Sequence, residues 1–137
     1  MKLLTANLTD LALDWALAKA LGAKKIIYSY KGVWVEDEGF KVGDDSRGWI
    51  HHTDPAVCLW LIKEYRASID QVEHDPKVQV TIWYEITDSD GSDFDAVSAL
   101  GDTLEQAIAR CVVQMRLGDE VDVLEELAGD AAREVVK

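Results

Sequence analysis

The stretch GDTLEQAIARCVVQMRLG, residues 101–118, decides the fold class of this chain. It opens on Asp102 with Glu105 three residues later, a capping-box arrangement in which Asp replaces the usual Ser or Thr. Gly118 is a typical stop signal after a helix. The apolar side chains fall on one stripe, made of Leu104, Ala107, Ile108, Cys111, Val112 and Met115. The stretch therefore predicts a one-sided helix with Asp102 as its N-cap and with Cys111 and Met115 in the core.

Two strands are expected directly before this helix. In VQVTIWYEI, residues 78–86, apolar and polar positions alternate as in a strand with one core face and one wetter face. The expected core face carries Val78, Val80, Ile82, Tyr84 and Ile86. Trp83 lies on the other face. TDSDGS then turns the chain, and DFDAVSAL returns as the partner strand.

The first half of the chain predicts a second helix and hairpin. Residues 8–22 indicate a largely buried helix, capped by Thr9 and ended by Gly22. Strands are expected over 25–30 and 33–36, with Lys31-Gly32 as the hairpin turn. The segment 40–42 is left open as a strand or a loop, and residues 43–50 are turn-rich.

A further helix is expected from Thr53 or Asp54, with Pro55 in its first turn, to about Ala67. A polar connection over 68–76 and a short last helix over about 123–136 complete the pattern. We therefore expect one α+β domain over residues 1–137, with an antiparallel sheet of about four strands packed with helices in the order α-β-β-α-β-β-α. Residues 119–137 form an acidic C-terminal tail or helix in this interpretation.

Charge narrows the class of partner. The chain of 137 residues carries 26 acidic and 14 basic side chains, a formal net charge of −12. Nucleic acids and anionic membranes are bound through Lys and Arg clusters, so we expect neither as a partner. A protein partner with basic character suits the balance better. The apolar excess leaves a homodimer open.

The cysteines and the N-terminal sequence suggest a cytoplasmic protein, either of a cell or of whatever infects it. Cys58 and Cys111 both lie in apolar helical patterns, which favours reduced core thiols over a disulfide. MKLLTANLTD has no apolar run of signal-peptide length.

No motif predicts catalysis, a metal or a cofactor. The chain lacks GxSxG, P-loop and HExxH patterns, so we expect a protein that is not an enzyme. His51, His52, Asp54, Cys58 and His74 do not have zinc-site spacing, and Asp54 is better explained as a helix cap. The acids of DSDGSDFD lack the glycine and glutamate positions of a calcium loop.

Two groups of residues are binding candidates. Trp34, Trp49 and Trp83 become anchors if one side of the sheet is open, and otherwise they cover helices. His52, from the His51-His52 pair, is kept with them. Asp119, Glu120 and Asp122 belong to the densest acidic run, which is either the solvated start of a helix or a docking surface for a basic partner.

Both ends of the chain resemble the phage NinX-type proteins of unknown function. Gly118 to Val121, Val123 and Glu125 to Leu127 agree with that family's closing motif, although Leu124 replaces its usual proline. The family's D-W-A-Q-G-G-P-I-I segment is absent. The opening motif is matched by Leu8, Thr9, Ala12, Leu13, Asp14, Trp15, Ala16, Ala18 and Lys19.

The middle of the chain is similar to the related phage ABA-sandwich domains. The matching residues are Thr53, Asp54, Trp60, Gly101, Asp102, Thr103, Ala107 and Ile108. These resemblances imply a phage or prophage origin and a fold, and they imply no activity. A strand followed by GDTLEQAIARCVVQM also looks like the end of HicB-type antitoxin domains.

Three functions follow as hypotheses. The first is an acidic, non-enzymatic phage accessory protein that binds a host or phage protein. The second is a small-molecule or nucleotide binder with a Trp-lined pocket. The third is an antitoxin-like module.

Overall fold

The computed structural model describes residues 1–29, 32–38, 40, 49–72, 75–88 and 91–127, and the fold is α+β as the sequence predicts. The helices and short 3-10 turns are α1 (Asp10–Ala20), α2 (Pro55–Tyr65), α3 (Leu104–Leu117), η1 (Thr5–Asn7) and η2 (Glu125–Leu127). His74 and Asp90, which the metal interpretations use, and the segment 41–48 lie outside these residues.

The described strands form three small antiparallel sheets, where the sequence predicted one sheet of about four strands. The first sheet pairs β1 (Lys2–Leu4) with β8 (Glu120–Asp122). The second has the order β2 (Ile26–Ser29), β3 (Gly32–Val35), β4 (Trp49–Ile50). The third has the order β5 (Ser68–Gln71), β6 (Val78–Asp88), β7 (Gly91–Gly101).

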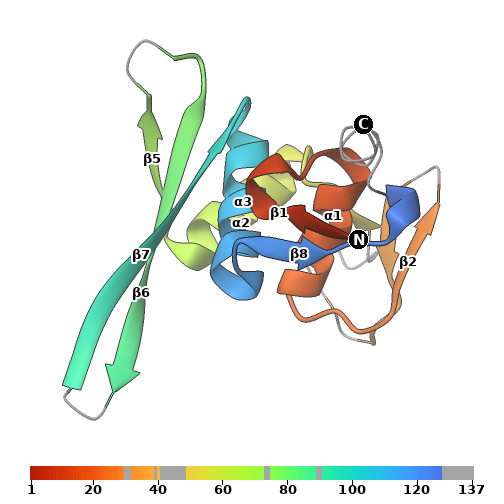
Figure 1. The fold of residues 1–137 in the computed structure, drawn as a ribbon, viewed down its shortest axis with the longest axis horizontal. Coiled ribbons are helices and arrows are strands. Elements are labelled where there is room, and N and C mark those ends of the chain that lie inside the picture. Colours follow the sequence, from red (N-terminus) through yellow and green to blue (C-terminus); the bar gives the residue numbers. More distant parts are fainter. Residues whose placement is uncertain (30–31, 39, 41–48, 73–74, 89–90, 128–137) are drawn as a thin grey trace.

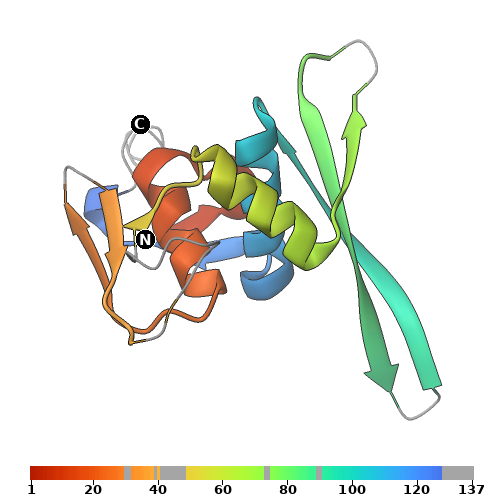
Figure 2. The ribbon, with the colours of Figure 1, turned by 180° about the vertical axis from the view of Figure 1, so that it is seen from behind.

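The β5–β6–β7 sheet lies at one end of the molecule and the β2–β3–β4 sheet at the other, with α1 and α3 between them (Figure 1). Seen from behind, α2 runs across the molecule and leads into β5 (Figure 2). The long β6–β7 hairpin extends past the helices, so part of it projects from the rest of the molecule, which is called the body below.

The core lies between α1, α3 and the inner face of the β6–β7 hairpin. Leu13 and Leu17 on α1 are fully buried, as are Ile108 and Val112 on α3. Cys111 is also fully buried and Met115 packs against this core, so both belong to the core as predicted. Ala109 and Val113 lie outside the predicted stripe and are fully buried as well, so α3 is buried on more than one side. No helix among the described residues combines the length and apolar character needed to cross a membrane.

The N-cap of α3 is Thr103, so the prediction of Asp102 was wrong by one residue. The Thr103 hydroxyl accepts a hydrogen bond from the Gln106 amide at 3.1 Å, and Gln106 Oε1 accepts one from the Asp102 amide at 2.9 Å. The capping residues are therefore Thr103 and Gln106, because the Thr103 hydroxyl bonds the amide of the third helical residue and the Gln106 side chain reaches back to an amide before the helix. Gly101 lies close above this turn: a Cβ there would lie 2.5 Å from the Ala107 nitrogen.

The acidic run begins as a strand, which corrects the predicted helix start, whereas only residues 123–127 of the predicted 123–136 helix are described. Glu120–Asp122 forms β8, paired antiparallel to Lys2–Leu4. The described part of the expected last helix contains only the short turn η2, and residues 128–137 lie outside the described chain. The start of the acidic run is therefore paired with the N-terminal segment.

Other boundaries moved by a few residues. α1 has Thr9 at its N-cap position, and Gly22 follows it with a φ of +94°, as expected. Asp54 caps α2 by accepting from the Ala56 amide, and α2 ends at Tyr65 rather than near Ala67. Gly32 is the first residue of β3 rather than part of the turn, and the turn residue Lys31 lies outside the described chain. The strands β1, β4 and β5 were not predicted.

Candidate functional site

The projecting part of the β6–β7 hairpin, residues 83–88 and 91–96, is the candidate interaction site and is called the arm below. β6 and β7 pair one to one from Val78 with Gly101 to Asp88 with Gly91, without a bulge. β5 pairs with β6 only from Val78 to Thr81, before the arm begins, and β7 pairs with no described strand other than β6. The arm is therefore a two-stranded ribbon that adjoins solvent.

The outer face of the arm carries two large aromatic side chains in the open. Trp83 is 62% exposed and Phe94 is 65% exposed. The register sets Trp83 opposite Ala96 and Glu85 opposite Phe94, so the two aromatics belong to neighbouring cross-strand pairs on one face. Exposed aromatic clusters of this kind are typical anchors at protein interfaces.

The inner face of the arm is partly exposed. Tyr84 and Ile86 were predicted to be core residues, but they are 36% and 39% exposed. The Tyr84 hydroxyl donates to Asp95 Oδ2 at 3.3 Å across the strands. The prediction of which face these residues share was right, and the prediction of their burial was wrong because the body does not reach this far (Figure 1).

Trp34 and Trp49 meet at the opposite end of the molecule. They are cross-strand neighbours on β3 and β4, with their rings edge to face and 5.0 Å between centroids. His51 stacks on Trp49 at 5.9 Å. Trp34 is half-buried and Trp49 is 37% exposed, so this pair mainly covers the second sheet. A Cβ at Gly32 would lie 2.6 Å from the His51 ring, so glycine lets this ring pack on β3.

His52 is a buried residue of the body, in contact with Asp14 on α1. Its backbone amide donates to Asp14 Oδ1 at 2.7 Å, and its Nδ1 lies 2.6 Å from the same oxygen. Both side chains are nearly fully buried. The pair fastens the segment before α2 to α1, and this accounts for a buried polar pair in structural terms.

Asp119, Glu120 and Asp122 lie at the β1–β8 sheet, which contains none of the candidate aromatic residues. Asp119 accepts a hydrogen bond from Gln114. Glu120 pairs with Leu4 and is exposed. Asp122 is exposed, and a hydrogen bond from the Met1 amino group, with its charge, lowers the pKa of that carboxyl. The candidate residues therefore form four separate groups rather than one site.

The cysteine thiols are part of the core. Cys58 and Cys111 are free and buried. Burial raises the pKa of both thiols, to about 11 for Cys111, so both are protonated at neutral pH. Among the described residues, no group of three or more His, Cys, Asp or Glu side chains is placed to hold a metal ion.

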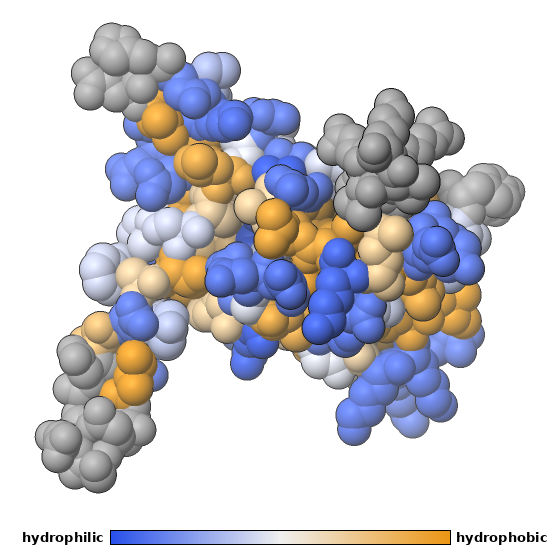
Figure 3. All heavy atoms as spheres, in the orientation of Figure 1, coloured by the Kyte–Doolittle hydropathy of each residue, from blue (hydrophilic) through white to orange (hydrophobic). Residues whose placement is uncertain are grey.

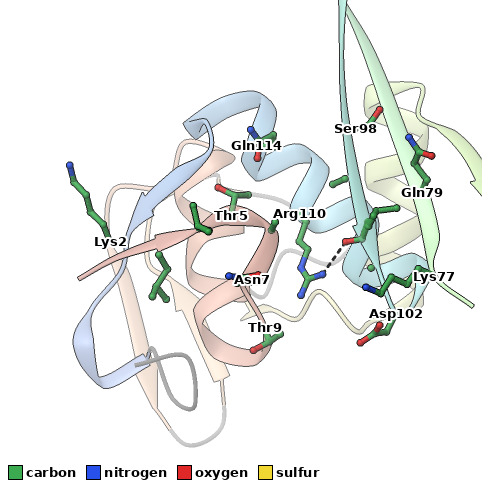
Figure 4. Close-up of a pocket in the computed structure, with 16 residues that line it drawn as sticks. Lys2, Thr5, Asn7, Thr9, Lys77, Gln79, Ser98, Asp102, Arg110 and Gln114 are labelled. Atoms are coloured by element: carbon green, nitrogen blue, oxygen red, sulfur yellow. Dashed lines mark hydrogen bonds between the residues drawn. The ribbon is translucent and has the colours of Figure 1, made fainter. Parts of the chain in front are cut away.

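A cleft that sequence reasoning missed lies between the N-terminal segment, the body end of β7 and α3. Its volume is about 840 Å³. Figure 4 shows Arg110 and Lys77 extending toward the space between these walls, whereas Lys2 extends away from it. No local motif points to this cleft, because its walls come from residues 2–9, 77–79, 98–102 and 110–114. No tryptophan is among its lining residues, so this cleft is not the Trp-lined pocket that the sequence offered as an alternative.

Comparison with known proteins adds no family: no protein-family model matches the chain, and no curated protein matches it. The exposed aromatics of the arm and the other groups described above are therefore the features that indicate a function.

Proposed function

We propose that this chain is a non-enzymatic binding protein whose arm contacts a basic protein partner. The observation that carries the proposal is the pair of exposed aromatics, Trp83 and Phe94, on the outer face of a projecting ribbon. A space-filling view also has hydrophobic residues beside hydrophilic ones along the arm (Figure 3). Exposed aromatic area costs solvation free energy unless a partner covers it.

The charge of the hairpin favours a basic partner. Residues 78–101 contain five acidic residues and no Lys or Arg. Of these, Glu85 and Asp95 are exposed on the described part of the arm. A partner with Lys or Arg around an apolar contact would complement both the aromatics and the acids.

We also propose where this protein acts. The resemblance to phage NinX-type proteins supports a phage or prophage accessory protein that acts in the bacterial cytoplasm on a host or phage protein. Neutralisation of a toxin, the HicB-like alternative, would be one case of the same kind of binding. A second copy of the chain is another partner that the arm can accommodate.

The test uses a matched pair of exposed apolar residues. Wild-type protein, Trp83→Ser and Leu59→Ser are immobilised, and proteins captured from a bacterial host lysate are quantified by mass spectrometry. Leu59 is 53% exposed on α2, outside the arm. We expect a basic protein that wild type and Leu59→Ser retain and Trp83→Ser retains about tenfold less, as for loss of a central interface aromatic. The proposal fails if nothing captured depends on Trp83.

A charge-reversal pair distinguishes the arm from the β8 acids. Glu85→Lys should weaken binding of the captured protein and reduce its salt dependence, whereas Glu120→Lys should change it little. The opposite order would move the binding surface to the acidic run of β8. Light scattering after size exclusion completes the design, since a dimer that Trp83→Ser dissociates would identify a second copy as the partner.

A further inference from the structure

The cleft beside β7 has the dimensions of a small-molecule site. Its volume of about 840 Å³ lies in the range of pockets that bind organic ligands. The segment β1–η1 forms one wall, the body ends of β6 and β7 form the other, and α3 supplies Arg110 and Gln114 (Figure 4). The cleft lies at the body end of the hairpin, so it is separate from the exposed aromatics of the arm.

Arg110 is a fixed cation that forms no ion pair with any described residue. Its Nε donates to the Leu8 carbonyl and its Nη1 to the Leu100 carbonyl, both at 2.9 Å. These two bonds hold the guanidinium in place. Its other N–H groups donate to no acceptor among the described residues. The side chain is partly buried, and no described carboxylate forms a salt bridge with it. Desolvation lowers the pKa of Arg110, and Asp102 opposes that effect only at longer range.

The lining of the cleft has a charge opposite in sign to the whole chain. Its ionisable residues are Lys2, Lys77, Arg110 and Asp102. Lys2 extends away from the cleft (Figure 4), and the other three sum to about +1, whereas the chain carries −12. Neither lysine forms an ion pair with another described residue. Concentrating cations in a concave site of an acidic protein raises the local potential for an anion.

Neutral polar groups complete the lining. The side chains of Asn7, Thr9 and Gln79 face no hydrogen-bond partner among the described residues, and Thr9 leaves its hydroxyl unused although it occupies the N-cap position of α1. Such groups can orient a polar ligand once a cation has attracted it.

We propose that this cleft binds a small organic anion through a phosphate or carboxylate group, with Arg110 as the fixed contact and Lys77 as the second cation. The anion would supply the counter-charge that the partly buried guanidinium lacks in the described chain. This site is independent of protein binding at the arm, and it has a different ligand chemistry.

The experiment titrates isotope-labelled full-length protein with inorganic phosphate and, separately, with succinate at constant ionic strength. Amide chemical shifts are followed by NMR. We expect saturable millimolar binding, with shifts confined to residues 5–9, 77–79 and 98–102. Lys77→Gln should weaken the affinity about tenfold, as for loss of one charge-assisted contact, while Lys63→Gln on α2 should leave it unchanged.

The two ligands distinguish the chemical source, because the tighter of them identifies phosphate or carboxylate as the recognised group. The proposal is overturned if neither ligand saturates, if the shifts lie outside the cleft, or if Lys77→Gln and Lys63→Gln behave alike. Arg110→Lys is informative only as a second variant, since it also removes the two carbonyl contacts that join α3 to the N-terminal segment and β7. The Lys77 side chain makes no such contact within the described chain, so its substitution removes a cation of the cleft without removing a contact that holds the fold.

Discussion

The two halves of the β6–β7 hairpin have the same pairing and the same alternation, yet they differ in burial. Near the body, Val80 and Ile82 are 0% and 1% exposed, whereas Tyr84 and Ile86 on the same face of the arm are 36% and 39% exposed. The difference lies in α3, which packs on the body half. A helix of 14 residues spans roughly 21 Å, while strands of 11 residues span roughly 36 Å.

The hairpin is therefore longer than the helix that covers it. Alternation along a strand determines which side chains share a face, but the length of the covering element determines how far along the strand they are buried. The part of the hairpin beyond the helix keeps Trp83 and Phe94 exposed, so it is available for a partner. Three substitutions or pairs of substitutions test this difference between the two halves.

The largest expected difference is between Ile82→Ala and Ile86→Ala. Both changes remove the same atoms from the same face of the same strand. We expect Ile82→Ala to lower the free energy of unfolding by about 2–5 kcal/mol, because it leaves a cavity under α3. Ile86→Ala should cost about 0.5 kcal/mol or less, as for most surface substitutions. Urea denaturation followed by circular dichroism measures both.

Equal costs for the two substitutions would contradict the comparison. A large cost at Ile86 would mean that the free protein already covers the arm, by a second copy or another part of the chain. Repeating the Ile86→Ala measurement over a range of protein concentrations separates these cases, since only self-association makes the stability depend on concentration.

Sequence patterns predicted the elements that carry a strong period and missed those that do not. The stripe of α3 and the alternation of β6 extend over 14 and 11 residues, enough to distinguish a helix from a strand. β1 and β8 have three residues each, and they pair although almost the whole chain separates them in sequence. No local sequence pattern therefore indicates them. β5 was missed because all four residues of SIDQ are exposed.

The candidate site was also predicted only in part, because local sequence patterns do not show contacts between distant segments. Trp83 was expected to be an anchor on the condition that one sheet face is open, and that face is open. His52 was selected for its chemistry, but its contact with Asp14 is a long-range packing feature that residue spacing does not reveal. The cleft joins four separate segments of the chain, and only the folded arrangement brings Arg110 and Lys77 to one space.

A smaller effect is expected at the start of the covering helix. Thr103→Ala removes the side-chain acceptor for the Gln106 amide and should cost about 1 kcal/mol of unfolding free energy. Asp102→Ala is the matched control and should cost less, because the Asp102 side chain makes no capping bond in the described structure. If the order is reversed, Asp102 is the N-cap in solution. Thermal melts of the two variants and the wild type make the comparison.

The smallest expected effect is a titration confined to the arm. Partial desolvation, the Asp95 charge and the hydrogen bond to Asp95 raise the pKa of the Tyr84 phenol above its ordinary value of 10.0. A raised folded-state pKa means that this contribution to stability is present below the ordinary pKa and is lost as pH rises through the folded-state value. The arm should therefore loosen at high pH by more than the body half of the hairpin.

Asp95→Asn isolates the cause. It removes the carboxylate charge, so the Tyr84 pKa should move down toward 10.0 while the contribution of desolvation stays. Ultraviolet absorbance of the tyrosinate, taken as the difference between each protein and its Tyr84→Phe counterpart, reports this residue against the other three tyrosines. An unchanged pKa in Asp95→Asn would show that the cross-strand contact is not formed in solution. The backbone hydrogen bonds between β6 and β7 would then hold the arm, and its side chains would be less ordered than those of the body half. A partner would have to order the side chains of the arm on binding.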